Sequence, residues 1–222
     1  MSNPEINTAY IKVTKTARYA SWGTLSEKTR YFWFVLHGSN MLCEQMIYKF
    51  MEFDPETHFV VAPEGLSRLY KDGFQGDVVA LWMTKRDRLH EIADFSEYLS
   101  TLYHSYMEKL PAEATKTILG FSQGGTTAYR WLHNTPIKAD FLISHSCWIP
   151  EDIDFMAQKE NFDQIRLIYT YGDQDPYLTD ERIEAVKTLM EKNQLAHDVE
   201  IFKGKHRIEK LHLNYLFNTY IK

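Results

Sequence analysis

A serine lies in the pattern G-x-S-x-G at residues 120–124, and Gly125 follows it directly. The preceding run, Thr115 to Leu119, is rich in β-branched and aliphatic residues and predicts a strand. Residues 126–133 have helical spacing, so Ser122 is expected on a sharp turn between a strand and a helix. Glycine tolerates such a turn because it has no Cβ atom. Ser122 is the first candidate nucleophile, and a glycine-rich loop with an incidental serine is the alternative.

A serine hydroxyl needs a general base, and an imidazole base needs a group that fixes its tautomer. Downstream of Ser122, an apolar run ending at Tyr171 enters a turn that carries Asp173 and Asp175. Aspartates in such turns commonly bond their own backbone two residues on, so either could be structural. We expect Asp175 to orient the base and Asp173 to form the turn.

The candidate base is His206, which follows a predicted strand ending near Phe202. Two other histidines compete with it. His197 precedes that strand and His212 lies in the predicted C-terminal helix, so both are expected to be surface or packing residues. The order serine, acid, histidine is the one found on α/β-hydrolase sheets. Parallel strands would bring the three turns to one edge of the sheet.

A tetrahedral acyl-transfer intermediate also needs N–H donors for its oxyanion, each worth roughly 3 to 4 kcal/mol. One candidate is the backbone N–H of Gln123, the residue after the nucleophile. The other is the N–H of Ser39, in the turn that follows a buried run ending at Leu36. In that turn His37 is expected to be structural, and Asn40 is a candidate N-cap for the next helix.

The elements that must position these turns follow from the apolar pattern. Two period-two stretches, Ala9 to Lys15 and Ala17 to Trp22, predict a hairpin at one sheet edge. Further strands are predicted at Tyr31 to Leu36, His58 to Ala62, Phe141 to Ser144, Ile165 to Tyr171 and Val199 to Phe202. Helices are predicted over Leu42 to Met51, Asp87 to Leu110 and Ile208 to Ile221. In the second, Asp87 is a candidate N-cap and Leu89 is expected on the apolar face. In the third, Leu211, Tyr215 and Leu216 are expected near one apolar face. The alternation predicts an α/β fold with a mainly parallel central sheet and helices on both faces.

One connection is unusually long. Glu64 to Trp82 is predicted to be irregular, and loops of that length are usually functional or mobile. No repeat or linker divides the chain, so a single domain is expected over residues 1–222.

Composition narrows the function classes. The chain has 25 basic and 30 acidic residues without a basic cluster, so nucleic acid is not an expected partner. No apolar run is long enough for a transmembrane segment. The two cysteines, Cys43 and Cys147, lack metal-ligand spacing, and no metal or cofactor is expected. The low cysteine content favours a cytoplasmic location. Composition indicates no oligomeric state.

With these residues in view, the chain resembles the phospholipase/carboxylesterase family of α/β-hydrolases, which includes the acyl-protein thioesterases. The resemblance rests on L-H-G at 36–38, G-F-S-Q-G-G at 120–125, S-C-W-I-P at 146–150, G-D-Q-D-P at 172–176 and G-K-H at 204–206. It implies a triad of Ser122, Asp175 and His206, oxyanion donors at Ser39 and Gln123, and an α/β-hydrolase fold without a large cap domain.

The chain also departs from the family's thioesterases. Those members usually show further glycine and acidic residues after H-G, where this chain has S-N-M at 39–41, and residues 62–70 differ as well. These departures argue against protein depalmitoylation.

The expected activity is that of a serine carboxylesterase acting on small-molecule or lipid-like esters, and the sequence leaves open whether thioesters or lysophospholipids are among them. Dienelactone-hydrolase-like or peptidase activity on the same triad is one alternative, and a non-catalytic ligand-binding protein is another. Arg68 could meet an acidic substrate group or form a surface salt bridge. Large apolar side chains in loops near the expected catalytic edge are candidates for the acyl pocket or for satellite core: Leu66, Leu69, Tyr70, Trp82, Met83 and Trp148.

Overall fold

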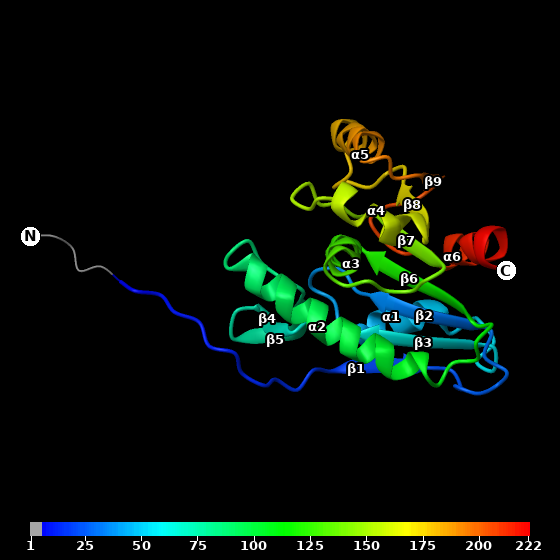
Figure 1. The fold of residues 1–222 in the computed structure, drawn as a ribbon, viewed down its shortest axis with the longest axis horizontal. Helices are drawn as coiled ribbons and strands as arrows, with labels where there is room; N and C mark the ends of the chain where they lie inside the picture. The colour runs from blue at the N-terminus through cyan, green and yellow to red at the C-terminus, as the bar shows by residue number, and fades with distance from the viewer. Residues whose placement is uncertain (1–5) are drawn as a thin grey trace, which may run out of the picture.

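The computed structural model describes residues 6–222, so the first five residues of the predicted single domain lie outside it. A seven-stranded sheet runs through the molecule in the order β1-β3-β2-β6-β7-β8-β9 (Figure 1). Its strands are β1 (Tyr19–Trp22), β2 (Tyr31–Leu36), β3 (His58–Pro63), β6 (Thr115–Phe121), β7 (Phe141–His145), β8 (Arg166–Gly172) and β9 (His197–Phe202). Only the β1–β3 pair in this sheet is antiparallel. The predicted mainly parallel sheet is confirmed.

The strand register brings the carboxyl ends of the central strands to one edge. Paired residues at this edge are Leu36 with Gly120, Phe121 with His145, and Gly172 with Phe202. The turns after β2, β6, β8 and β9 therefore leave the sheet side by side, which is where open α/β sheets place their ligands.

Helices cover both faces of the sheet, because buried strands need apolar cover on each side. They are α1 (Cys43–Phe50), α2 (Arg88–Met107), α3 (Gln123–Asn134), α4 (Lys159–Asp163), α5 (Asp180–Lys192) and α6 (Lys210–Leu216), with a 3₁₀ turn η1 (Met156–Gln158) and a π-helical end η2 (Phe217–Ile221). Within residues 6–222, no helix is both long and apolar enough to cross a membrane.

Alternate side chains of β2 feed two separate apolar cores. Phe32 and Phe34 join the larger core with residues of α2 and α3. Trp33 and Val35 join the smaller core with residues of α1 and α6. The wholly apolar run from Tyr31 to Leu36 thus reflects a strand that is buried on both faces.

The predicted N-terminal hairpin is wrong. Only Tyr19–Trp22 forms a strand, and it pairs with β3. Residues 6–18 form no strand, and their N-terminal part projects away from the rest of the molecule (Figure 1). Their alternation buries nothing, since the Ile11 and Val13 side chains are exposed. The period-two pattern lacked a partner strand to pack on.

The predicted irregular connection is also wrong, because most of it forms a second sheet. β4 (Ser67–Asp72) and β5 (Gln75–Leu81) make an antiparallel hairpin that turns at Gly73, where φ is +78°. Most of its residues are exposed, so the apolar alternation that would reveal a strand is weak. A bridge between Met41 and Ala80 ties the hairpin base to the turn after β2.

Two helix details differ from the predictions. Asp87 has a left-handed backbone and does not cap α2 with its side chain, and Leu89 is exposed instead of facing the core. At the C-terminus Leu211 and Tyr215 are exposed, while α6 buries Leu213 and Leu216.

Candidate active site

Ser122, His206 and Asp175 form a continuous hydrogen-bonded relay at the carboxyl edge of the sheet. Nε2 of His206 lies 3.0 Å from Oγ of Ser122. Nδ1 of the same ring lies 2.7 Å from Oδ2 of Asp175. Because the carboxylate can only accept, Nδ1 carries the proton and Nε2 presents its lone pair to the serine hydroxyl. This is the arrangement that a serine nucleophile and its general base require.

The turn that presents Ser122, here called the nucleophile turn after its candidate nucleophile, is strained and tightly packed. Ser122 has φ +52° and ψ −121°, a conformation that L residues rarely adopt. A Cβ atom on Gly124 would lie 2.3 Å from the carbonyl oxygen of Leu36 and 2.5 Å from that of His37. Gly124, two residues after Ser122, thus lets the start of α3 pack directly against the end of β2.

The turn after β8, here called the acid turn, carries Asp173 and Asp175, and these two aspartates make different contacts. The Asp175 side chain is fully buried, and its second oxygen, Oδ1, accepts the Tyr177 N–H at 2.9 Å. Asp173 is exposed, and its Oδ1 accepts the Gly204 N–H at 3.0 Å. Asp173 therefore ties the acid turn to the turn after β9 that carries His206, whereas Asp175 contacts the His206 imidazole itself.

Two aromatic rings pack against the His206 imidazole. The Phe121 ring centre lies 4.9 Å away, and the Tyr177 ring meets the imidazole edge-on at 4.7 Å. The sequence pattern singles out neither residue. Phe121 directly precedes Ser122, and Tyr177 lies two residues after Asp175. This nearness in the chain is a weak signal, because aromatic residues are common in turns.

The competing histidines lie elsewhere. His197 Nε2 bonds the Tyr129 hydroxyl at 2.7 Å at the start of β9, and burial lowers its pKa to about 4. His212 Nε2 bonds the Thr170 hydroxyl at 2.7 Å, and burial lowers its pKa as well. Both are packing residues bonded to core hydroxyls, and neither is bonded to Ser122.

The two candidate oxyanion donors come from different elements. Ser39 is exposed, and its N–H makes no backbone hydrogen bond within residues 6–222. Gln123 is the first residue of α3, where a backbone N–H has no acceptor inside the helix. Asn40 is not the N-cap of α1, because Leu42 takes that place and the Asn40 N–H bonds Ala80 O at 3.1 Å.

The side chain of Gln123 has a further role that the sequence did not reveal. Its Oε1 accepts the Trp82 N–H at 3.0 Å, and its Nε2 donates to Met83 O at 2.8 Å. The Trp82 indole in turn donates to His37 O at 2.8 Å and stacks on the His37 ring. Gln123 thus joins the nucleophile turn to the turn after β2 through the chain that follows β5.

The six predicted pocket residues separate into two groups. Trp82 is a core residue, while Met83 and Trp148 are half-buried against the larger core, and Trp148 O accepts a bond from Thr126 of α3. Leu66, Leu69 and Tyr70 lie in and before the β4–β5 hairpin, with Leu69 and Tyr70 exposed. Backbone atoms of the first group bond Gln123 and Thr126 at the start of α3.

A hollow of about 650 Å³ lies away from this site. It is at the opposite edge of the sheet, around the starts of β8 and β9. Its walls are formed by Asp140, residues 162–167 and residues 195–198. Ser122 and its partners lie at the carboxyl ends of the strands, so this hollow does not receive their substrate.

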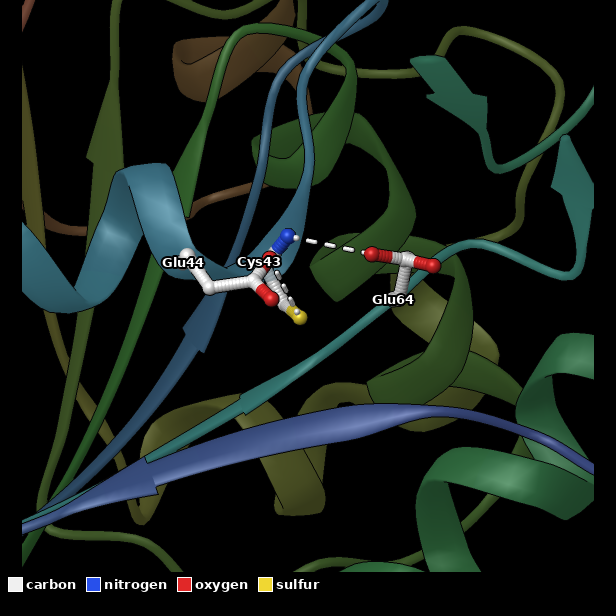
Figure 2. Close-up of side chains that lie close together, drawn as sticks. All are labelled: Cys43, Glu44 and Glu64. Carbon is white, nitrogen blue, oxygen red and sulfur yellow. Dashed lines mark hydrogen bonds between the residues drawn. The ribbon is translucent and has the colours of Figure 1, made fainter. Parts of the chain in front are cut away.

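Cys43, Glu44 and Glu64 bring ligand atoms within 4.8 Å of one another (Figure 2). The Arg18 guanidinium already contacts all three side chains, at 3.1 Å from Cys43 Sγ and 2.7 Å from Glu64 Oε2. Burial raises the pKa of the Cys43 thiol to about 12, and the bond from Arg18 lowers that of Glu44 to about 2. A metal ion would have to displace the guanidinium and ionise a resistant thiol, so the group fits an ion-pair network better.

Comparison with known proteins gives a family and several similar folds. The sequence profile of the family described as Phospholipase/Carboxylesterase matches residues 39–219. Esterase PE8 shares 17% identity over 92% of this chain and 97% of its own, with a TM-score of 0.63. Acyl-protein thioesterase 2 of Zea mays shares 14% over 91% and 97%, with a TM-score of 0.70. A carboxylesterase of Bacillus cereus shares 13% over 92% and 93%, with a TM-score of 0.66. A search of curated protein sequences finds no match.

Proposed function

Because the chain belongs to the phospholipase/carboxylesterase family, and is thus a serine hydrolase of ester bonds, we propose that it cleaves carboxylic esters through Ser122, His206 and Asp175. The observation that carries the proposal is the relay itself. Oγ of Ser122 lies 3.0 Å from the His206 Nε2, and Nδ1 of that ring lies 2.7 Å from the buried Asp175 carboxylate.

The reaction begins with attack of Ser122 Oγ on the ester carbonyl carbon while His206 Nε2 takes the hydroxyl proton. The carbonyl oxygen becomes an oxyanion, for which the backbone N–H groups of Ser39 and Gln123 are the proposed donors. The intermediate collapses as the C–O bond to the leaving group breaks, and His206 gives its proton to the departing alkoxide. The products of this half-reaction are an alcohol and an acyl-Ser122 ester.

Water completes the cycle. His206 takes a proton from water as the oxygen attacks the acyl carbon, and the second tetrahedral intermediate releases the carboxylic acid. The proton on His206 returns to Ser122 Oγ. Asp175 stays ionised throughout and stabilises the imidazolium that forms twice in each turnover.

Oxygen esters are the proposed first substrate class. The same steps apply to a thioester, and the Zea mays neighbour is named for acyl-protein thioesters. However, the present chain has S-N-M at 39–41 after its H-G pair, which departs from the thioesterase pattern. Matched pairs of an oxygen ester and a thioester with the same acyl group test this order, because a higher kcat/KM for the thioester would reverse it.

A panel of p-nitrophenyl esters of increasing acyl length tests the proposal. Ser122→Ala removes the attacking oxygen, so its rate should fall by at least about 10³-fold. Ser105→Ala, in an exposed turn of α2, is the matched control and should keep the wild-type rate. Equal rates for wild type and Ser122→Ala would show that Ser122 is not the nucleophile.

A further inference from the structure

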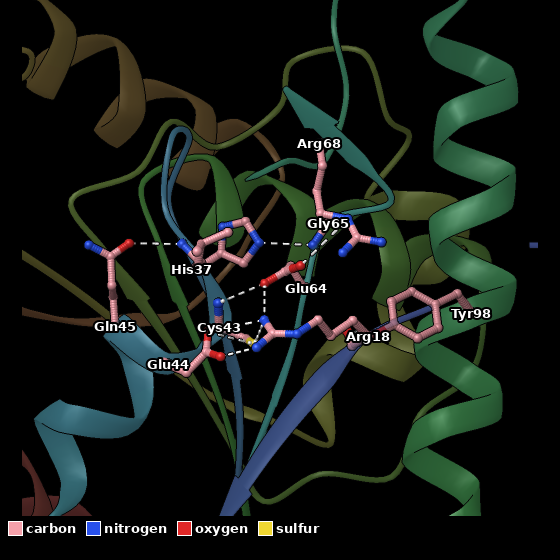
Figure 3. A network of polar contacts seen from close by, with 10 residues as sticks. Arg18, His37, Cys43, Glu44, Gln45, Glu64, Gly65, Arg68 and Tyr98 are labelled. Carbon is pink, nitrogen blue, oxygen red and sulfur yellow. Dashed lines mark hydrogen bonds and ion pairs between the residues drawn. The ribbon is translucent and has the colours of Figure 1, made fainter. Parts of the chain in front are cut away.

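The turn from His37 to Cys43, here called the oxyanion turn, is held at its two ends by two consecutive residues, Glu64 and Gly65, that follow β3 (Figure 3). We propose that the Arg18–Glu64 ion pair is a positioning device that sets the Ser39 N–H for the oxyanion. This inference rests on the proposed function, since it gives a further role to residues behind the same site.

Gly65 holds the first end of the oxyanion turn. Its N–H donates to Nε2 of His37 at 2.9 Å, and Nδ1 of His37 donates to Gly38 O at 2.7 Å. The ring is therefore neutral with its proton on Nδ1, and burial lowers its pKa in agreement with this state. A Cβ atom on Gly65 would lie 2.3 Å from Leu81 O. Gly65 thus lies closely packed between His37 and the end of β5, with no room for a side chain.

Glu64 holds the second end. Its Oε2 accepts the N–H of Cys43 at 3.4 Å, and Cys43 is the first residue of α1. A carboxylate at this place accepts one of the free N–H groups of the helix and complements the positive end of its dipole. The Glu64 side chain is only 1% exposed, so few other positions are open to its carboxylate.

Arg18 offsets the cost of burying the charged Glu64 carboxylate. Its Nη1 donates to Glu64 Oε2 at 2.7 Å, and the same guanidinium pairs with Glu44 at the surface. The main chain repeats the connection, because the Glu64 N–H donates to Arg18 O at 3.0 Å. The other cation near Glu64 in the described chain is Arg68, whose Nε lies 3.9 Å from Oε1. Loss of Arg18 would leave a buried charge with a weak partner, which normally forces rearrangement.

The consequence falls on Ser39, which lies between the two held ends. Its neighbours Asn40 and Met41 are paired with Ala80 of β5, whereas Ser39 itself makes no backbone hydrogen bond within the described chain that would fix its N–H. An oxyanion exists only in the transition state and the intermediate, so a displaced donor lowers kcat and leaves ground-state binding intact. A merely structural pair would change unfolding without this split between kcat and KM.

The test uses Glu64→Gln, Arg18→Met and the double variant in the full chain. Glu64→Gln keeps the shape of the side chain, and Arg18 is half-exposed, so both variants are expected to fold. For a p-nitrophenyl ester, kcat should fall by about tenfold to a hundredfold, below the ~10²–10³ seen when an oxyanion donor is deleted. KM should stay within about twofold. Because both substitutions break the same ion pair, the double variant should lose no more of its kcat than the less active of the two single variants.

A second measurement reads the oxyanion directly. An alkyl trifluoromethyl ketone forms a tetrahedral adduct whose oxygen needs the same donors, so its affinity should fall by the same factor as kcat. The control is Asp198→Asn, which removes the carboxylate of an equally close pair with Arg166 at the opposite edge of the sheet. This control should retain kcat and inhibitor affinity.

The outcomes separate the inference from the proposed function. If Glu64→Gln kept the wild-type kcat and ketone affinity while Ser122→Ala abolished hydrolysis, the inference would be overturned and the proposed function would stand. A loss expressed equally in Glu64→Gln and Asp198→Asn would also overturn the inference, because the effect would then be general. Full activity of Ser122→Ala would overturn the proposed function and the positioning role that depends on it.

Discussion

The two sides of the nucleophile turn are built by different means. On one side, β8 and β9 end in adjacent turns, and each brings one functional side chain to the relay. On the other side, the oxyanion turn contributes backbone groups, and its position depends on side chains from elsewhere: Arg18, Glu64, Gln123 and Trp82. The first side contributes side chains of its own turns to the relay. The second side is positioned by side chains from distant parts of the chain.

The largest expected effect breaks the first side. Asp175→Asn should lower kcat by about 10⁴-fold, because an amide no longer enforces the His206 tautomer that faces Ser122. Asp173→Asn should keep most of the activity and lower stability, since Asp173 bonds the Gly204 N–H and does not touch the imidazole. Kinetics with a p-nitrophenyl ester and urea unfolding of both variants measure the contrast. If Asp173→Asn were the inactive variant, the orienting acid would be Asp173.

The sequence predicted the first side better than the second, and the reason is physical. Asp175 and His206 each sit in a turn directly after an apolar strand, and parallel strands place such turns at one edge. Their approach therefore follows from topology, even though they are 31 residues apart. The sequence favours Asp175 over Asp173 as the partner of the imidazole, and Asp175 is the aspartate that contacts it.

On the second side, the sequence indicated the backbone position of Ser39 but not its supports. The Arg18–Glu64 pair spans 46 residues and joins a residue outside any predicted motif to one in a predicted loop. The β4–β5 hairpin was missed because its exposed residues leave little apolar alternation. Without that hairpin, the bonds from Ala80 and Trp82 to the oxyanion turn could not be foreseen.

A second prediction tests the link between the two sides. Gln123→Ala retains the backbone N–H but removes the bonds to Trp82 and Met83, so the nucleophile turn and the oxyanion turn lose their side-chain connection. We expect kcat to fall by about tenfold to a hundredfold, in line with the cost of a small displacement of catalytic groups. Steady-state kinetics measure this fall.

Gln123→Glu is the matched variant for this link. It can still accept the Trp82 N–H, but when ionised it sets a carboxylate oxygen against Met83 O in place of a donor, so its kcat should fall at least as far as that of Gln123→Ala. If Gln123→Ala kept the wild-type kcat, the two sides would be positioned independently of this side chain.

The smallest expected effect compares two buried histidines, one on each side. His37 has both ring nitrogens bonded, whereas both nitrogens of His145, at the end of β7, lack partners within residues 6–222. Burial lowers the pKa of His145 to about 3, while an unfolded histidine titrates near 6.5. Between these values the unfolded chain binds the proton and the folded chain does not. His145 therefore favours folding fully above pH 6.5, and this contribution is lost as the pH falls, by up to about 1.4 kcal/mol per pH unit.

Urea unfolding of wild type and His145→Leu from pH 7.5 to 4.5 measures this slope. The variant cannot take up the proton, so its free energy of unfolding should fall less steeply below pH 6.5, although cavity and packing changes will shift the whole curve. His104→Leu, at an exposed position of α2, should keep the wild-type slope. Parallel curves for wild type and His145→Leu would assign the acid sensitivity to other groups. His37 would then be the first to consider, because its protonation breaks the Gly65 bond that holds the oxyanion turn.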